Sequence, residues 1–350
     1  MKIALSHFLT PLVLTASLFA HNSLVYEGAS GPGRGRHIVF LAGDHEYRSE
    51  ETVPALARLL AKHHGFKCTV LFTVDSVSGE IVPGNSNMPG LEALATADLA
   101  VVYLRFQAFP PEQMKHFIAY LDRGGPIVGL RTATHAFRFP DGSPFAKYST
   151  EHKGSHYEFG FGHQILGQTW VGHYGKNHVQ STRITPVEAH GSHPILRGVR
   201  NVWVQAGGYV GKPVGAEILT MAQPLNGMTP DAPIDTTKPA QPSEWTRTYR
   251  AANGKTARVF TSLYGASEDL LNEGYRRLLV NGCFWAVGME KDIKPDLPVG
   301  LVGPYHPVTF GPRHRLGVRP SDLAGWDAPI MPPDRPLKPA PPTKAKKAAK

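Results

Sequence analysis

Short apolar runs alternate with helix-periodic segments along the first 130 residues, and this alternation constrains the fold more than any other feature. The apolar runs are 37–42, 67–72, 99–104 and 127–130. Segments 50–64 and 111–123 repeat apolar residues at helical spacing and are followed by Gly65 and Gly124. Strands alternating with helices predict βαβ units and an α/β fold with a parallel sheet. Because such sheets bind ligands beyond the carboxyl ends of their strands, we expect the site there.

Composition indicates how the chain is divided into segments. We expect a signal peptide over 1–20, a linker over 21–35, one α/β domain over 36–295, a Pro- and Gly-rich extension over 296–337 and a basic disordered tail over 338–350. Within the domain, later strands are expected at 217–221, 244–249 and 258–263, and a helix over 270–287.

The first twenty residues are typical of a secretory leader. Lys2 precedes a mostly apolar stretch that runs from Ile3 to Ala20, with cleavage expected near Ala20. This predicts a periplasmic or secreted protein with no stable membrane span after cleavage. An uncleaved N-terminal anchor is the alternative.

The positive charge is largely local. The chain has 37 basic and 28 acidic residues, a formal +9, but Lys2 and five lysines from residue 338 onward account for six, which leaves about +3. That excess does not favour a nucleic-acid partner. Cys68 and Cys283 lie in apolar segments and are interpreted as buried thiols.

Three titratable residues follow the first apolar run. Asp44, His45 and Glu46 stand where a strand would end, and such groups can bind a metal ion or exchange protons. The alternative is a turn in which Ser49 caps the next helix and Glu46 is solvated.

The segment 126–135 resembles the nucleophile elbow of class I glutamine amidotransferases: an apolar strand, a glycine, then the nucleophile on a sharp turn. Arg131 stands in the place of the cysteine, and a guanidinium cannot attack a carbonyl. No histidine occurs at 263–265, where the later histidine of those enzymes would fall. Amidotransferase chemistry is therefore excluded.

Histidines are concentrated in the middle of the chain. Eight of the seventeen lie between His135 and His193, without zinc-site spacing. We expect at least one to line the site. Trp170, Tyr174 and Trp203 could form a floor on which a sugar stacks, or could simply pack in the core.

Together the motifs resemble the ThuA-like (trehalose-utilisation) family over about 36–290. The resemblance rests on segments 43–48, 129–137, 162–173, 193–198, 245–247, 258–263 and 276–286. It implies a flavodoxin-like, class I glutamine amidotransferase-like sheet with helices on both faces and a role in carbohydrate breakdown, including trehalose and keto-sugar derivatives. It also implies a polar crevice formed by Asp44, His45, Glu46, Arg131, His135 and His173. The sequence departs from the family at Tyr264-Gly265, where Gly-His is common.

The leading hypothesis is an enzyme that moves protons next to a carbonyl of a sugar or keto-sugar. The expected catalytic residues are His45, Glu46, Arg131, His135 and His173, with Arg131 stabilising an oxyanion; the expected substrate-binding residues are Asp44, Tyr47, Trp170 and His163. A divalent metal ion could replace Arg131 in that role, with His45, His135 and His173 as candidate ligands.

Two other hypotheses remain open. The chain could be a non-catalytic carbohydrate-binding protein with the same crevice, or an envelope-associated protein whose lysine-rich tail contacts anionic polymers. The expected partner is a small carbohydrate, and the chain could form a homo-oligomer.

Overall fold

The computed structural model describes residues 23–154 and 156–339. The expected signal peptide and most of the basic tail lie outside these residues. Among the described helices, none combines the length and apolarity needed to cross a membrane.

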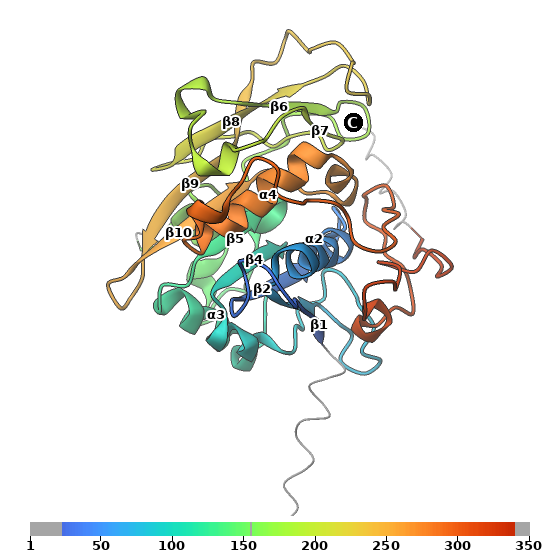
Figure 1. Ribbon diagram of the computed structural model, residues 1–350. Coiled ribbons are helices and arrows are strands. Elements are labelled where there is room, and N and C mark those ends of the chain that lie inside the picture. Colours follow the sequence, from blue (N-terminus) through green and yellow to red (C-terminus); the bar gives the residue numbers. More distant parts are fainter. Residues whose placement is uncertain (1–22, 155, 340–350) are drawn as a thin grey trace, which may run out of the picture.

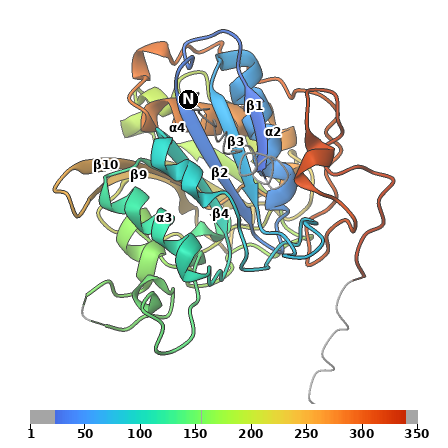
Figure 2. The ribbon, with the colours of Figure 1, turned by 90° about the horizontal axis from the view of Figure 1, so that it is seen from below.

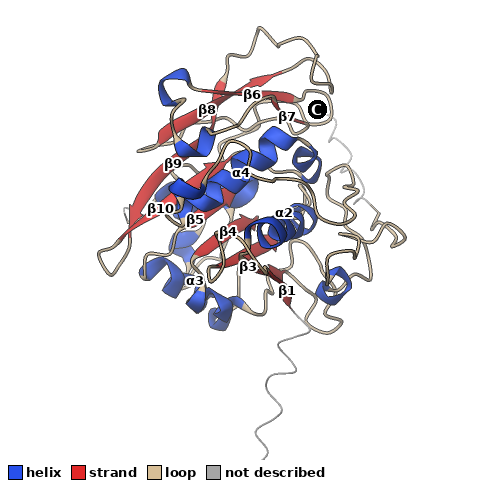
Figure 3. Cartoon of the chain, in the orientation of Figure 1, coloured by secondary structure: helices blue, strands red, loops and turns tan. Residues whose placement is uncertain are grey.

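One ten-stranded mixed sheet forms the centre of the molecule (Figure 3). Its strands are β1 (Ser23–Glu27), β2 (His37–Gly43), β3 (Lys67–Phe72), β4 (Leu99–Leu104), β5 (Ile127–Leu130), β6 (Thr182–Pro186), β7 (Val202–Val204), β8 (Glu217–Pro224), β9 (Gln241–Arg250) and β10 (Thr256–Ser262). They are arranged in the order β1-β3-β2-β4-β5-β10-β9-β8-β6-β7.

The parallel part of the sheet is its middle. Strands β3, β2, β4, β5 and β10 pair in parallel, whereas β1 and the strands from β9 to β7 pair antiparallel. The expectation of a parallel sheet is therefore wrong for half of the strands. Hairpin connections such as the one between β9 and β10 allow antiparallel pairing without a crossover helix.

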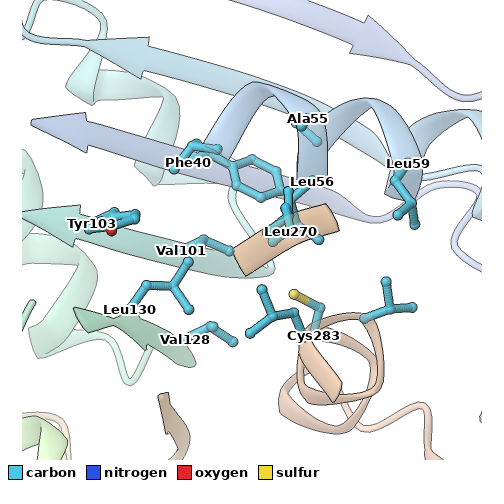
Figure 4. Close-up of a cluster of buried hydrophobic side chains, with 14 of the residues drawn as sticks. Phe40, Ala55, Leu56, Leu59, Val101, Tyr103, Val128, Leu130, Leu270 and Cys283 are labelled. Carbon is cyan, nitrogen blue, oxygen red and sulfur yellow. The ribbon is translucent and has the colours of Figure 1, made fainter. Parts of the chain in front are cut away.

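Helices cover both faces of the parallel strands. Helices α2 (Ser49–His64) and α4 (Glu273–Ala286) pack on one face, and α3 (Pro111–Asp122) packs on the other (Figure 1; Figure 2). Because side chains alternate along a strand, Phe40 joins the first core and Leu41 the second. Figure 4 shows Phe40, Leu56, Val101, Val128 and Cys283 in the core between the sheet, α2 and α4.

The expected helices are confirmed with small changes at their ends. Helix α2 is followed by Gly65 at φ 81°, and α3 begins at Pro111, as the sequence predicts. The last helix begins at Glu273, after a separate 3-10 turn over Ser267–Leu271. The sequence does not predict strands β6 and β7, because β6 lies in the histidine-rich region without a clear period and β7 is only three residues long.

The segment expected to be a linker is part of the fold. Strand β1 pairs with β3, and the turn after it packs so tightly that a Cβ on Gly28 would lie 2.4 Å from the carbonyl carbon of Gly65. Glycine is needed there for close approach of two backbones. The linker interpretation is wrong for 23–35 because the contacts that order this segment come from β3 and α2.

The Pro- and Gly-rich extension also packs on the domain, although it has almost no regular structure. It lies beside α2 in Figure 1, where it is drawn in orange to red, and buries Tyr305, Phe310 and Leu323. Tyr26 of β1 and Arg58 of α2 both donate to the carbonyl oxygen of Leu323, at 2.8 and 2.9 Å. The first and last described segments are thereby joined.

Candidate functional site

Three neighbouring parallel strands end at the same edge of the sheet, and a polar segment follows each. These segments are 44–48 after β2, 105–107 after β4 and 131–135 after β5. Gln107 joins them: its side-chain nitrogen donates to the carbonyl oxygen of Gly43 at 2.7 Å, and its backbone nitrogen donates to Ala136 at 2.7 Å. The site that the strand ends predict is therefore a connected unit.

Each segment also contains one non-glycine residue with a left-handed backbone. The φ angles are 66° at Arg48, 50° at Phe106 and 42° at Arg131. Such conformations cost on the order of 1 kcal/mol each and are concentrated at functional sites. Their coincidence at one edge of the sheet supports a functional role for this region.

Asp44 holds the first segment together. Its carboxylate is buried and accepts hydrogen bonds from the backbone nitrogens of Glu46, at 2.9 Å, and Tyr47. Burial raises its pKa, against the opposing effect of Arg105 and His45. Ser49 does not cap α2; its hydroxyl oxygen accepts instead from the Asp44 backbone nitrogen at 2.9 Å. Asp44 therefore shapes the turn and offers no exposed group to a substrate.

Arg131 lies beneath the surface of the site. Its two terminal nitrogens each donate at 3.0 Å, one to the carbonyl oxygen of Leu263 and the other to that of Gly207. The rings of Tyr47 and Tyr209 contact the guanidinium, with centroids 3.7 and 4.4 Å from its central carbon. Both terminal nitrogens are thus engaged and the residue is fully buried. The oxyanion role expected of Arg131 does not fit this geometry, and Tyr47 is likewise too buried to touch a substrate.

His45, Glu46 and Arg105 form the accessible polar group at this edge. Arg105 makes an ion pair with Glu46, and the same Arg105 nitrogen lies 3.5 Å from Nε2 of His45. All three side chains are partly exposed. Burial lowers the pKa of His45 and Arg105 lowers it further, although Asp44 acts in the opposite direction. His45 is therefore neutral at neutral pH and can accept a proton.

Sequence reasoning missed Arg105. It directly follows the apolar run 99–104, so the rule that selected Asp44 and Arg131 applied equally to this position. No second titratable residue stands beside Arg105, so no cluster of such residues marks the position in the sequence.

An aromatic cluster brings two of the mid-chain histidines and Trp170 together around Tyr209. The ring of Tyr209 lies 5.9 Å from that of His135, 5.4 Å from that of His173 and 6.3 Å from that of Trp170. His135 is 2% exposed, and burial holds its pKa well below the ordinary value, with Arg105 and Arg131 acting in the same direction. His173 lies at the surface, and its partial burial against this cluster also lowers its pKa.

A cavity of about 450 Å³ adjoins this cluster. Phe106 and Trp170 line it, and both also contact His135, with ring centroids 5.0 and 5.5 Å away. Trp170 is 37% exposed, so its ring is accessible to a ligand. His163 lines the cavity too, beside Phe159 and apart from the other histidines.

The remaining predictions concern Trp203, Tyr174 and a metal site. Trp203 lines a separate groove formed by residues of β6 and β7 together with Pro230. Tyr174 donates its hydroxyl to the carbonyl oxygen of Pro239 at 2.5 Å, and neither residue lines the cavity. Among residues 23–154 and 156–339, no three His, Cys, Asp or Glu side chains gather as a metal ion would require. His45, His135 and His173 thus do not fit a shared metal.

The extension supplies contacts that sequence reasoning did not anticipate. Phe310 packs on Tyr47 with ring centroids 5.1 Å apart, and the Gly311 nitrogen donates to the carbonyl oxygen of Glu46 at 2.7 Å. Pro312, His314 and Lys338 line a second hollow next to His45. No periodic pattern marks these residues in the sequence.

Comparison with known proteins gives structural neighbours only. No family model matches the chain, and no curated protein matches it. A solved structure from Parabacteroides merdae, described as ThuA-like, has 14% identity and a TM-score of 0.44, covering 79% of this chain and 96% of its own. Another from Bacteroides uniformis, described in the same way, has 14% identity and a TM-score of 0.46, covering 78% and 100%. An exo-β-1,4-mannosidase from an Opitutaceae bacterium has 12% identity and a TM-score of 0.31, covering 72% of this chain and 36% of its own. The chain is thus similar, over more than three quarters of its length, to two proteins that carry the name of the family its sequence motifs resemble.

Proposed function

We propose that this chain is an exported protein of carbohydrate catabolism that abstracts a proton next to a carbonyl of a sugar or keto-sugar. We also propose that the parallel strands and their helices have the flavodoxin-like arrangement of class I glutamine amidotransferases. It is supported by the five parallel strands, whose order in the sheet is 2-1-3-4-5 when they are numbered along the chain. The sequence motifs supply the link to carbohydrates.

One observation carries the proposal. The imidazole of His45, whose pKa is lowered by burial, lies beside the guanidinium of Arg105 at the carboxyl edge of the parallel strands. The Arg105 guanidinium lies 5.4 Å from the ring of Phe106, which lines the cavity together with the exposed Trp170. A base next to a fixed positive charge is the arrangement that proton abstraction next to a carbonyl requires, because negative charge develops on the carbonyl oxygen.

In the proposed reaction, the sugar ring packs on Trp170. His45 removes the proton from the carbon beside the carbonyl, the electron pair of the broken C–H bond forms a C=C bond, and the π pair of the carbonyl moves to its oxygen. Arg105 takes the role first expected of Arg131 and stabilises the resulting enolate. Glu46 holds Arg105 through their ion pair. His173, whose ring lies 5.9 Å from that of Trp170, exchanges a proton with a hydroxyl of the substrate.

The second candidate function is carbohydrate binding without turnover. It is favoured by the approach of Arg105 to Nε2 of His45, at 3.5 Å, because a guanidinium that donates to this nitrogen makes the ring less available as a base. The same cavity and the same tryptophan would serve both functions.

Proton exchange distinguishes the two candidates. Purified protein is incubated with keto-disaccharides in D2O, and proton NMR follows deuterium incorporation beside the carbonyl. The wild type is expected to catalyse incorporation, and His45→Asn should slow it by about a hundredfold or more, since positioned bases contribute factors of this order. His190→Asn, at a surface pair with Glu217, is the matched control. Binding by calorimetry without any incorporation would support the binding function instead.

The proposed setting is the periplasm or the exterior, with a small carbohydrate as partner and no nucleic acid. The leader that motivates this setting lies outside the described residues. We also propose that the chain forms a homo-oligomer, and sedimentation of the purified protein tests this.

A further inference from the structure

The cavity beside Trp170 combines an apolar surface with a basic rim. Phe106, Phe159 and Trp170 provide aromatic faces, and Phe159 and Trp170 are 36% and 37% exposed. Apolar faces of sugar rings pack on such rings. A volume of about 450 Å³ lies in the range of pockets that hold small ligands, and it is enough for a disaccharide.

The charges that line this cavity are unequal. Arg138, Lys153 and Lys212 are basic and Glu151 is the one acidic side chain, which gives three positive charges against one negative, or +2. Arg138 is neutralised by an ion pair with Glu151, and its guanidinium lies on the ring of Phe106, 3.7 Å from the centroid. Lys153 and Lys212 make no ion pair with any residue of 23–154 and 156–339.

The backbone that carries Lys212 is held in place. Gln168, which is 3% exposed and also lines the cavity, accepts from the Lys212 nitrogen at 2.6 Å and donates to the Val210 carbonyl oxygen at 2.6 Å. The 210–212 segment is thus fixed against the cavity wall, whereas the ammonium group at the end of the Lys212 side chain is exposed to solvent. Because the backbone of Lys212 is already fixed, only its side chain has to be ordered when it binds an anion, which reduces the entropy that is lost.

We infer that the substrate of this site is an acidic carbohydrate, a disaccharide that carries a carboxylate such as a uronic acid. Its ring packs on Trp170, and its carboxylate interacts with Lys153 and Lys212. This inference rests on the proposed function, which by itself requires only a sugar with a carbonyl group. The two unpaired ammonium groups add a selection for negative charge that a neutral keto-sugar would not use.

The test compares digalacturonate with its dimethyl ester, which has the same rings without the charges. Calorimetry with the full chain should give tighter binding of the acid by about tenfold, because two exposed ion pairs contribute a factor of a few each. The preference should shrink between 50 and 500 mM salt. Lys153→Met with Lys212→Met should remove the preference and retain binding of the ester. Lys291→Met, at an exposed lysine outside the cavity, should change neither affinity.

The outcomes separate this inference from the proposed function. Equal binding of acid and ester, with both weakened by Trp170→Ala, would overturn the acidic substrate and leave the carbohydrate function standing. If neither compound binds and keto-disaccharides fail as well, the proposed function is overturned and the inference with it. Binding of citrate as tight as that of digalacturonate would show that the site selects charge alone, and would also overturn the inference.

Discussion

Arg131 directly follows strand β5 at the carboxyl edge of the sheet, yet it is fully buried. Its hydrogen bonds join the end of β10, at Leu263, to the loop at Gly207, and its guanidinium lies between two tyrosine rings. A planar group with several donors suits this environment, and an ammonium does not. The residue therefore stabilises the floor of the site and positions Tyr209 under the histidines.

Arg131→Lys is expected to lower the free energy of unfolding by about 2–4 kcal/mol, because at least one buried carbonyl loses its partner and the stacking is lost. Urea denaturation measures the change. Arg36→Lys, at an exposed pair with Asp98, should change stability by less than about 1 kcal/mol. Equal effects of the two substitutions would contradict the anchoring role of Arg131.

His45 determines the pH dependence of the proposed reaction. Its pKa lies below the ordinary 6.5 because burial and Arg105 disfavour the protonated ring. As the base must be neutral, the exchange rate should fall as pH drops through the lowered pKa of His45, which places the acid limb of the profile below that of an ordinary histidine. Arg105→Met removes a nearby cation and releases Glu46, and both effects raise the pKa of His45. The acid limb of the rate profile should then move to higher pH; a limb that stays in place would show that another group titrates.

At the level of elements, the extension behaves as a part of the site. Phe310 is 3% exposed and contacts Tyr47 and His178, the latter at 4.4 Å between ring centroids. Phe310→Ala should destabilise the docked extension by about 3 kcal/mol, as for other buried phenylalanines. Limited proteolysis should then cut within 300–320 faster than in the wild type. Leu316→Ala, at a side chain that is 38% exposed, is the control. Unchanged cleavage in Phe310→Ala would mean that other contacts hold the extension.

The elements that the sequence predicts are those whose signal is local. The apolar runs of β2 to β5 and the helical periods of α2 and α3 are fixed by neighbouring residues, and they also locate the strand ends where Asp44, His45 and Arg131 follow. Strand β1 and the extension depend on partners far along the chain, so no local pattern marks them. Burial also depends on residues that are far away in the sequence. For this reason the sequence predicts that Asp44, Tyr47 and Arg131 contact a substrate, although they support the site from beneath.

At the scale of the whole molecule, the two end segments close over one side of the domain. Tyr26 and Arg58 bind the extension at Leu323, and His64 at the end of α2 hydrogen-bonds through Nε2 to the carbonyl oxygen of Pro298 at 2.9 Å. The His64 ring also packs on Phe284 of α4, with centroids 5.1 Å apart. One imidazole thus joins α2 to two other parts of the chain, the extension and α4.

Burial lowers the pKa of His64 to about 4, so the folded protein keeps this ring neutral while an unfolded chain binds a proton near pH 6.5. The unfolded state therefore binds more protons between these values, and stability falls as pH drops from about 6.5 towards 4. For this residue alone the loss of stability approaches about 3 kcal/mol at the lower limit.

His64→Gln retains a donor for Pro298 without a titrating ring. Its urea midpoint should be lower than that of the wild type at pH 7 and should change less between pH 7 and pH 5. Parallel pH profiles of the two proteins would show that acid destabilisation arises at other groups, of which His314, with a pKa also lowered to about 4 by burial, is the first to examine.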